Sequence, residues 1–170
     1  MKNKQLRLVT LAALFAALIM LMTAYVLHIP TGLNDGYIHL GDTMIYVAAS
    51  MLPLPYAMAA AGIGGALADI LSGAMLWAPF TAVIKALMVL PFTCRNERIL
   101  CRRNGIAVVL AGLIGIAGYF VTAAILYDPA AAVTEILPNL IQESAGGALY
   151  LVLALVFDRA GLKSRLQKMV

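Results

Sequence analysis

The chain has 170 residues, of which 63% are hydrophobic and only 12% charged, and its formal net charge at pH 7 is +4. Soluble domains carry about 25% charged residues, so this composition excludes a soluble globular protein. A mean hydropathy of +0.94 agrees with that exclusion and predicts an integral membrane protein.

The first predicted element is an apolar helix over about residues 8–27, which follows the basic residues Lys2, Lys4 and Arg7. An uncharged apolar run of about 18 residues or more is a candidate membrane helix. This run is too long for the core of a signal peptide, and no small-residue cleavage site follows it. A loop then carries residues 35–42 (DGYIHLGD), which include Asp35, a histidine and a tyrosine. We interpret this loop as a cover over a small solute at the outer membrane face.

Further helices are predicted over about residues 40–52, 56–71, 77–93, 106–127 and 138–157. Pro53 and Pro55 separate the second helix from the third, because proline removes a backbone donor. The stretch 130–137 reads either as a short surface helix or as the start of the last span. All of residues 1–170 are expected to form one membrane domain.

The second segment is short for a hydrocarbon core of roughly 30 Å, which leaves a five-helix alternative in which residues 40–52 and 56–71 form one kinked helix. Basic residues favour the cytoplasmic side. Three basic residues precede the first helix, four lie in residues 95–103 and four follow the last helix, out of twelve in the chain. Only six helices put all three groups on one side. The predicted fold is therefore an all-α, compact bundle of six transmembrane helices with both termini cytoplasmic.

The acidic residues gather toward the opposite side. Because acids contribute little to topology, this bias suggests polar chemistry in the outer half of the bundle. The acids concerned are Asp35, Asp42, Asp69, Asp128, Glu135 and Glu143.

Lys85 lies inside the fourth predicted helix, where a charge costs roughly 3 kcal/mol on insertion scales. It should therefore face the bundle interior and have a partner. It is predicted to bind ligand, and the alternative is a structural ion pair with Asp69, Asp42 or Glu143.

A polar stripe on the last helix contains Asn139, Gln142, Glu143 and Gly146, whose spacing puts them on one face. The amides could hydrogen-bond a polar heterocycle or could join helices to one another. Tyr119 belongs to a similar, weaker stripe on the fifth helix.

Aromatic residues lie near the predicted outer boundary. Trp77, Tyr37, Tyr46 and Tyr127 fit an aromatic belt, which is the preferred interpretation for Tyr127. Trp77 and Tyr37 flank the polar loops and could instead stack on a ligand. His39 with Asp42 offers too few ligands for a selective metal site.

Other classes of function have weaker support. Cys94 and Cys101 lack the four-ligand pattern of zinc and should stay reduced on the cytoplasmic side. The basic residues lie at membrane boundaries, so no nucleic-acid partner is predicted. No catalytic constellation and no cofactor motif is present, so the chain is not expected to be an enzyme.

Two pairs of small residues lie four apart on the first helix: Ala12 with Ala16, and Ala13 with Ala17. Each pair makes a smooth stripe for close packing, either inside the bundle or against a partner helix.

Together these features resemble the substrate-binding S component of an energy-coupling factor (ECF) vitamin transporter, over nearly the whole chain. The resemblance rests on six helices, the alanine pairs and the order of four motifs: residues 36–42 (GYIHLGD), 62–69 (GIGGALAD), 78–85 (APFTAVIK) and 139–142 (NLIQ).

The resemblance implies a vitamin or precursor bound near the outer face of a prokaryotic plasma membrane, beneath the loop that joins the first two helices. It also implies a T component, contacted by the alanine face, and two cytoplasmic ATPase subunits, with membrane lipid around the bundle. The amino-terminal sequence MKNK lacks the histidine of the nickel and cobalt branch, so a metal substrate is not expected. The residues expected to bind substrate are Tyr37, His39, Asp42, Tyr46, Asp69, Trp77, Lys85, Tyr119, Asn139, Gln142 and Glu143.

The sequence leaves the substrate open. Riboflavin, a pyridoxine-like compound or a thiamin precursor fits the mixture of amides, aromatics and one lysine, and pantothenate could pair its carboxylate with Lys85. The alternative functions are a non-transporting membrane scaffold or assembly subunit and, third, a membrane-embedded enzyme that uses the acids.

Overall fold

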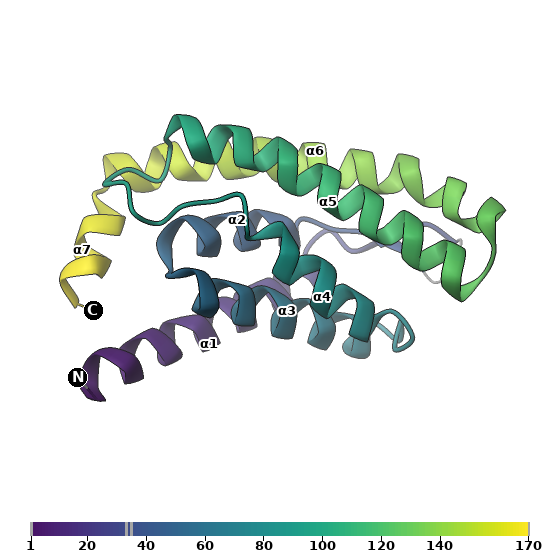
Figure 1. Cartoon of the computed structure of the whole chain (residues 1–170), viewed down its shortest axis with the longest axis horizontal. Helices are drawn as coiled ribbons and strands as arrows, with labels where there is room; N and C mark the ends of the chain where they lie inside the picture. Colours follow the sequence, from purple (N-terminus) through teal and green to yellow (C-terminus); the bar gives the residue numbers. More distant parts are fainter. Residues whose placement is uncertain (1, 33, 35, 170) are drawn as a thin grey trace.

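A computed structural model describes residues 2–32, 34 and 36–169 of the chain, and Asp35 lies outside the described residues. It is mostly helical, which confirms the predicted all-α fold (Figure 1). In chain order the elements are α1 (Lys2–Ala24), β1 (Ile29–Pro30), β2 (Tyr37–Ile38), α2 (Gly41–Met51), α3 (Leu54–Leu71), α4 (Ala78–Met88), α5 (Arg102–Leu126), α6 (Pro129–Arg159) and α7 (Leu162–Met169).

The helices form two groups with α2 between them. Helices α5 and α6 pack along each other on one side, while α3 packs against both α1 and α4 on the other. The amino and carboxyl termini lie at the same end of this bundle (Figure 1). The connection between α1 and α2 reaches the opposite end, where α5 turns into α6.

Four of the described helices are long and apolar enough to cross a membrane: Asn3–Ala24, Leu54–Leu71, Arg102–Leu126 and Pro129–Arg159. Helix α4 is apolar but has 11 residues, and α2 also has 11. At 1.5 Å per residue each of these two helices is roughly 16 Å long, about half the hydrocarbon thickness.

Helix α2 is enclosed by α1, α3 and α6, and every one of its residues except Met44 is buried. A helix that is buried all round must satisfy its polar side chains with groups from neighbouring helices. Asp42, Thr43, Tyr46 and Ser50 all lie on this helix. Its polar groups therefore determine how the surrounding helices are placed.

Several helix ends differ from the predicted ones. Helix α1 begins at Lys2 rather than residue 8, since the basic residues before the apolar run continue the helix without a breaker, and it ends at Ala24 rather than residue 27. Helix α4 ends at Met88 rather than residue 93. Pro91, which cannot donate a backbone hydrogen bond, follows within three residues.

The last long helix starts at Pro129, so residues 130–137 are the beginning of α6 and not a separate surface helix. The side chain of Asp128 caps this start, accepting a hydrogen bond from the Ala131 amide at 2.8 Å. Proline is well tolerated in the first turn. The sequence signal for the helix start was therefore present at residues 128–129.

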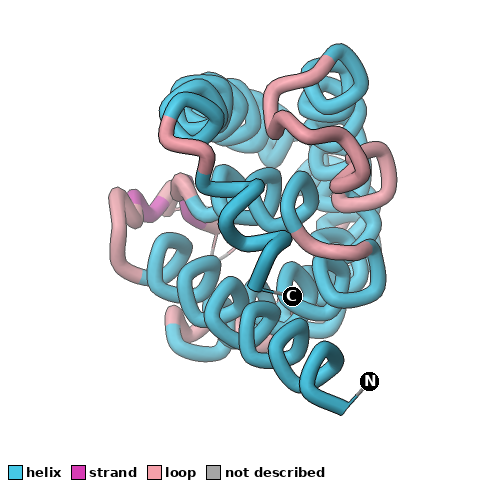
Figure 2. The backbone as a smooth tube through the Cα atoms, turned by 90° about the vertical axis from the view of Figure 1, so that its left-hand side faces the viewer, coloured by secondary structure: helices cyan, strands magenta, loops and turns pink. Residues whose placement is uncertain are grey.

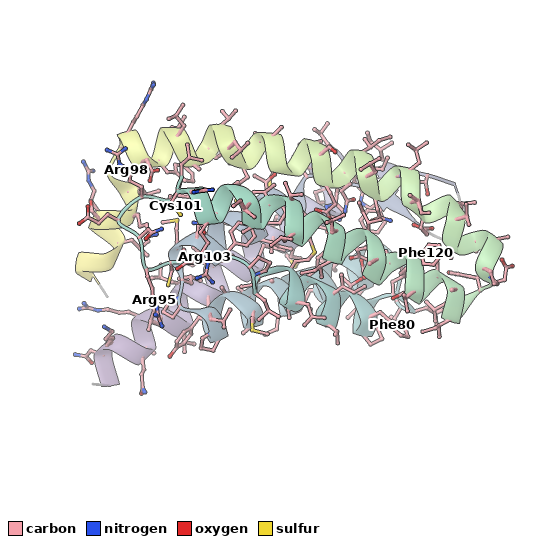
Figure 3. All side chains as sticks on the ribbon, turned by 45° about the horizontal axis from the view of Figure 1, so that its top comes forward. Phe80, Arg95, Arg98, Cys101, Arg103 and Phe120 are labelled. Carbon is pink, nitrogen blue, oxygen red and sulfur yellow. The ribbon has the colours of Figure 1, made fainter. Side chains whose placement is uncertain are left out.

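The basic loop between α4 and α5 lies at the end of the bundle that carries the termini, as Arg95, Arg98 and Arg103 show in Figure 3. The Asp158 carboxylate accepts the Ile99 and Leu100 amides at 2.7 and 2.9 Å. The loop is thus ordered by a side chain from the end of α6.

Small residues on α3 let its neighbours approach closely. A Cβ added at Gly64 would lie 2.7 Å from the Ala16 carbonyl oxygen, and one added at Gly62 would lie 2.8 Å from the Ala82 carbonyl oxygen. Such contacts with backbone atoms cannot be relieved by a side-chain rotation. The glycines therefore fix the spacing of α1 and α4 from α3.

Gly64→Ala should destabilise the protein by about 1–3 kcal/mol, because the new methyl group must push α1 away from α3. Thermal unfolding in detergent should show a lower Tm. Gly105→Ala is the matched control, since an added Cβ there meets nothing within 4 Å. An equal Tm for the Gly64 and Gly105 variants would show that α1 and α3 are not in close contact.

Candidate functional site

A β-hairpin joins α1 to α2 and covers the end of the bundle opposite the termini. Its strands pair antiparallel, with Ile29 opposite Ile38 and Pro30 opposite Tyr37. In the view along the bundle the strands lie to one side of the helices (Figure 2). The sequence predicted a loop here, and two-residue strands are too short to leave an alternating pattern in it.

Asn34 anchors the tip of this hairpin. Its side-chain amide donates to Glu135 Oε1 at 3.1 Å and Thr134 Oγ1 at 3.2 Å, both on α6. Its carbonyl oxygen accepts from Trp77 Nε1 at 3.1 Å and from the Tyr127 hydroxyl at 3.3 Å. One hairpin residue is thereby bonded to α6 and to the residues that precede α4 and α6.

Beneath the hairpin lies a cavity of about 40 Å³. Its walls come from the hairpin, from α3, α4, α5 and α6, and from the turn before α4, and they combine aromatic rings with amide, carboxylate and hydroxyl groups. The lining residues are Thr31, Gly36, Tyr37, His39, Asp69, Ala74, Trp77, Thr81, Tyr119, Glu135, Pro138, Asn139 and Gln142.

Seven of the eleven residues predicted to bind substrate line this cavity: Tyr37, His39, Asp69, Trp77, Tyr119, Asn139 and Gln142. They come from five separate parts of the chain. The other four, Asp42, Tyr46, Lys85 and Glu143, lie outside the lining and form a buried polar layer.

The polar layer is centred on Asp42, which is fully buried at the start of α2. Its Oδ1 lies 2.6 Å from Lys85 Nζ of α4, and its Oδ2 accepts from Gln142 Nε2 of α6 at 2.9 Å. Of the three acids considered as partners for Lys85, the structure selects Asp42. Gln142 connects this pair to the cavity above, because its Oε1 accepts the His39 amide at 3.1 Å.

Glu143 lies one residue further along α6. One of its carboxylate oxygens accepts a hydrogen bond from the Tyr46 hydroxyl, and Oε1 is buried without a partner in the described structure. A Cβ added at Gly115 would lie 2.6 Å from that oxygen, so the carboxylate packs against the small residues of α5.

His39 is held neutral at the rim of this layer. Burial lowers the pKa of its imidazole to about 4. Its Nδ1 accepts the Gly41 amide at 3.0 Å, so the proton of the neutral ring is on Nε2. His39 therefore lines the cavity as a neutral residue that keeps one N–H donor.

Tyr37 donates its hydroxyl to Asp69 Oδ1 at 2.6 Å. Burial, together with the charge of the Asp69 carboxylate, raises the pKa of Tyr37, so the hydroxyl keeps its proton. This bond ties the second strand of the hairpin to the end of α3.

Sequence reasoning missed Asn34, Thr81 and Glu135 as site residues. Glu135 lies four residues before Asn139 and extends the polar stripe by one turn, but the predicted helix began only at residue 138. No sequence pattern identified Asn34 as a site residue, because its role depends on which distant segments meet at the hairpin tip.

The alanine pairs of α1 differ in burial. Ala12 and Ala16 are buried against the bundle, whereas Ala13 and Ala17 are exposed. An apolar groove of about 600 Å³ runs between α1 and α3, and all four alanines line it. Tyr56 and Ile63 are among the larger residues on its α3 side.

In the described part of the chain, no group of three or more histidine, cysteine, aspartate or glutamate side chains is arranged to hold a metal ion. The aromatic and amide groups of the cavity are instead suited to an organic ligand.

Comparison with known proteins identifies a matching family and a relative. A family model described as "ECF-type riboflavin transporter, S component" matches residues 3–159. A protein of Pyrococcus woesei, described as "Uncharacterized protein in gap 3'region", is 34% identical over 131 residues. These residues cover 74% of this chain and 84% of that protein.

Replacing Asn34 with glycine should loosen the hairpin, because glycine keeps the positive φ of 50° but removes the bonds to Glu135 and Thr134. Two such bonds contribute about 1–3 kcal/mol, so hydrogen exchange of residues 29–38 should accelerate at least about fivefold. Thr134→Val, which leaves the Glu135 bond, should have a smaller effect. Unchanged exchange in Asn34→Gly would show that other contacts hold the hairpin.

Proposed function

Because the chain belongs to the family of ECF-type riboflavin transporter S components, we propose that it binds a riboflavin-type vitamin beneath the hairpin, at the outer face of the membrane, and presents it to an ATP-driven importer. S components are substrate-binding subunits of membrane transporters and not enzymes. The alternative of a non-transporting scaffold is not favoured by this membership.

The observation that carries the proposal is the cavity itself. Trp77 and Tyr119 supply aromatic surfaces in its wall, and Asn139 and Gln142 supply amides. Polar groups inside an apolar bundle are costly, and they are a default sign of a functional site. This cavity lies at the end away from the basic residues, where a solute from outside would arrive.

The cavity must enlarge to hold a vitamin. At about 40 Å³ it has room for a few water molecules, whereas ligand pockets typically measure about 300–1,000 Å³. The hairpin is the element best suited to move, because it is joined to the helices by hydrogen bonds of Asn34, Tyr37 and His39. Such bonds can be exchanged for bonds to water or ligand. We propose that residues 30–41 act as a gate that opens for entry and becomes more ordered when ligand is bound.

The four predicted site residues outside the lining have a supporting role in this proposal. Asp42 holds Gln142 from below, and Lys85 neutralises Asp42. Tyr46 and Glu143 bond to each other in the same layer. They would act on the ligand by positioning the cavity floor.

We also propose six membrane crossings with both termini in the cytoplasm. The arrangement in Figure 1 supports this, since the termini and the α4–α5 loop share one end. Residues 95–103 lie at that end and include four of the twelve basic residues of the chain. The positive-inside rule expects such residues at a cytoplasmic face.

The partners proposed for transport are a T component and two ATPase subunits. The groove between α1 and α3 is the proposed contact for the T component, because its small residues would let a partner helix approach closely. Ala13 and Ala17 are exposed on its α1 side.

Ligand binding can be followed with the intrinsic fluorescence of Trp77, the single tryptophan of the sequence. Purified protein should be titrated with riboflavin, pyridoxine, thiamin and pantothenate. Riboflavin is expected to quench the emission in a saturable way, because its ring would stack near Trp77. No saturable change with any of the four compounds, and no vitamin released on denaturation, would refute the proposed function.

Membrane orientation can be tested in intact cells with an impermeant maleimide, in a background of Cys94→Ser and Cys101→Ser. Ala130→Cys should be labelled from outside and Ser164→Cys should not, since these exposed residues lie at the start of α6 and in α7 respectively. External labelling of Ser164→Cys would overturn the proposed orientation.

Binding and transport should separate at the groove. Ala17→Trp adds a large side chain on the exposed side of α1, so it should keep riboflavin affinity within about twofold while abolishing recovery of the T component complex. Ala16→Trp is the contrasting variant, because Ala16 is buried against α3 and should lose folding and binding together. Normal complex recovery with Ala17→Trp would place the partner surface elsewhere.

A further inference from the structure

Asp69 has an unused acceptor in the wall of the cavity. The residue lies near the end of α3 and is 5% exposed. Its Oδ1 accepts the Tyr37 hydroxyl at 2.6 Å, while Oδ2 is buried and has no hydrogen-bond partner in the described structure. A buried polar atom left unpaired costs about 1–3 kcal/mol, and more for a charged group, so its retention calls for a reason.

The other carboxylate in the lining differs in this respect. Glu135 uses Oε1 to accept the Asn34 amide at 3.1 Å and Oε2 to accept the Asn139 amide at 3.4 Å. The Thr81 hydroxyl also interacts with the Asp69 carboxylate, and it keeps its own O–H as a donor while it accepts the Tyr119 hydroxyl at 3.3 Å. Asp69 Oδ2 is nevertheless the carboxylate oxygen of the described lining that has no hydrogen bond, so a ligand donor can bond to it beside Thr81.

The charges around the cavity favour hydrogen-bond donors. Its described lining contains two carboxylates and the neutral His39, but no lysine or arginine. Lys85 lies outside the lining, with its Nζ 2.6 Å from Asp42. A carboxylate or phosphate on the ligand would meet Asp69 and Glu135 without a free cation to offset the repulsion.

The aromatic walls favour a flat ring. The ring centroids of Trp77 and Tyr119 are 5.9 Å apart, with their planes 47° from parallel. Thr81, which interacts with Asp69, is also the hydrogen-bond partner of Tyr119. A planar heterocycle stacked on one of these two rings would lie in the same cavity as Asp69, toward which it can direct an edge N–H.

We propose that Asp69 is a specificity-determining residue, whose Oδ2 accepts a hydrogen bond from a ring N–H of a planar nitrogen heterocycle that carries no negative charge. This inference rests on the proposed vitamin-binding function and adds to it the ligand group that Asp69 recognises. The selectivity expected is for a ring N–H over its N-methylated form, and for an uncharged compound over its phosphate ester.

The experiment compares riboflavin with 3-methylriboflavin, in which the ring N–H is replaced by N–CH₃, using Trp77 quenching as the measure of affinity. Wild-type protein should bind riboflavin at least tenfold more tightly than the methylated compound. Asp69→Asn, which keeps an acceptor for Tyr37, should reduce this ratio to within about twofold of unity. Riboflavin 5′-phosphate should bind the wild type more weakly than riboflavin.

Glu135→Gln is the matched control, because it removes the other lining carboxylate while the tenfold preference for the ring N–H should persist. If Asp69 serves only to hold Tyr37 and the hairpin, Asp69→Asn will weaken both compounds equally and leave the ratio unchanged, which overturns the inference. Wild-type binding of both compounds with equal affinity also overturns it, while the vitamin-binding function stands. Failure of the wild type to bind either compound would overturn the inference together with a riboflavin substrate.

Discussion

The contact between Lys85 and Asp42 puts two opposite charges in the interior of an apolar bundle. Each charge alone would be costly at this depth, and each removes most of that cost for the other. Removing one partner of such a buried pair typically costs about 3–5 kcal/mol, because the remaining charge is left without compensation. The pair joins α2 to α4, and Gln142 joins the same carboxylate to α6. Three helices from different parts of the chain are thereby aligned around one side chain.

The short central helix explains why this contact matters. Helix α2 has only 11 residues, nearly all buried, and cannot be held in place by its own length across the membrane. Asp42 at its start and Tyr46 one turn later bond to α4 and α6. The hairpin ends where α2 starts, so Asp42 lies next to the base of the hairpin and also holds Gln142, which lines the cavity.

The helices and the hairpin are held in place by different kinds of contact. The helices are held by close backbone contacts, such as that of Gly64 with Ala16, which allow little movement. The hairpin is held largely by hydrogen bonds, including those of Asn34, which can be exchanged for bonds to water or ligand. Helix α3 contributes Asp69 to the cavity and Ile63 to the apolar groove, so one rigid element contributes to both proposed binding surfaces.

Much of the protein could be predicted from the sequence. Composition and apolar runs determined a helical membrane protein, because a chain in lipid must satisfy its backbone within helices. The motifs around Asp69 and Gln142 indicated residues that do line one cavity. The last helix was predicted to begin near Pro138, with residues 130–137 as either a surface helix or the start of this span, and the structure confirms the second alternative. A proline can lie inside a membrane helix when neighbouring groups satisfy the freed carbonyl.

Only the tertiary structure decided which side chains contact one another. Sequence spacing placed Lys85 in the interior with three acids in reach, and the meeting of α2 with α4 selected Asp42. The tertiary structure likewise brought Asn34 into hydrogen-bonding contact with Glu135, about 100 positions away in the chain. It also left Asp69 Oδ2 without a hydrogen bond. Periodicity reports which face of a helix a residue occupies, since it depends on local geometry. Which faces meet depends on packing between distant segments, and no local pattern records it.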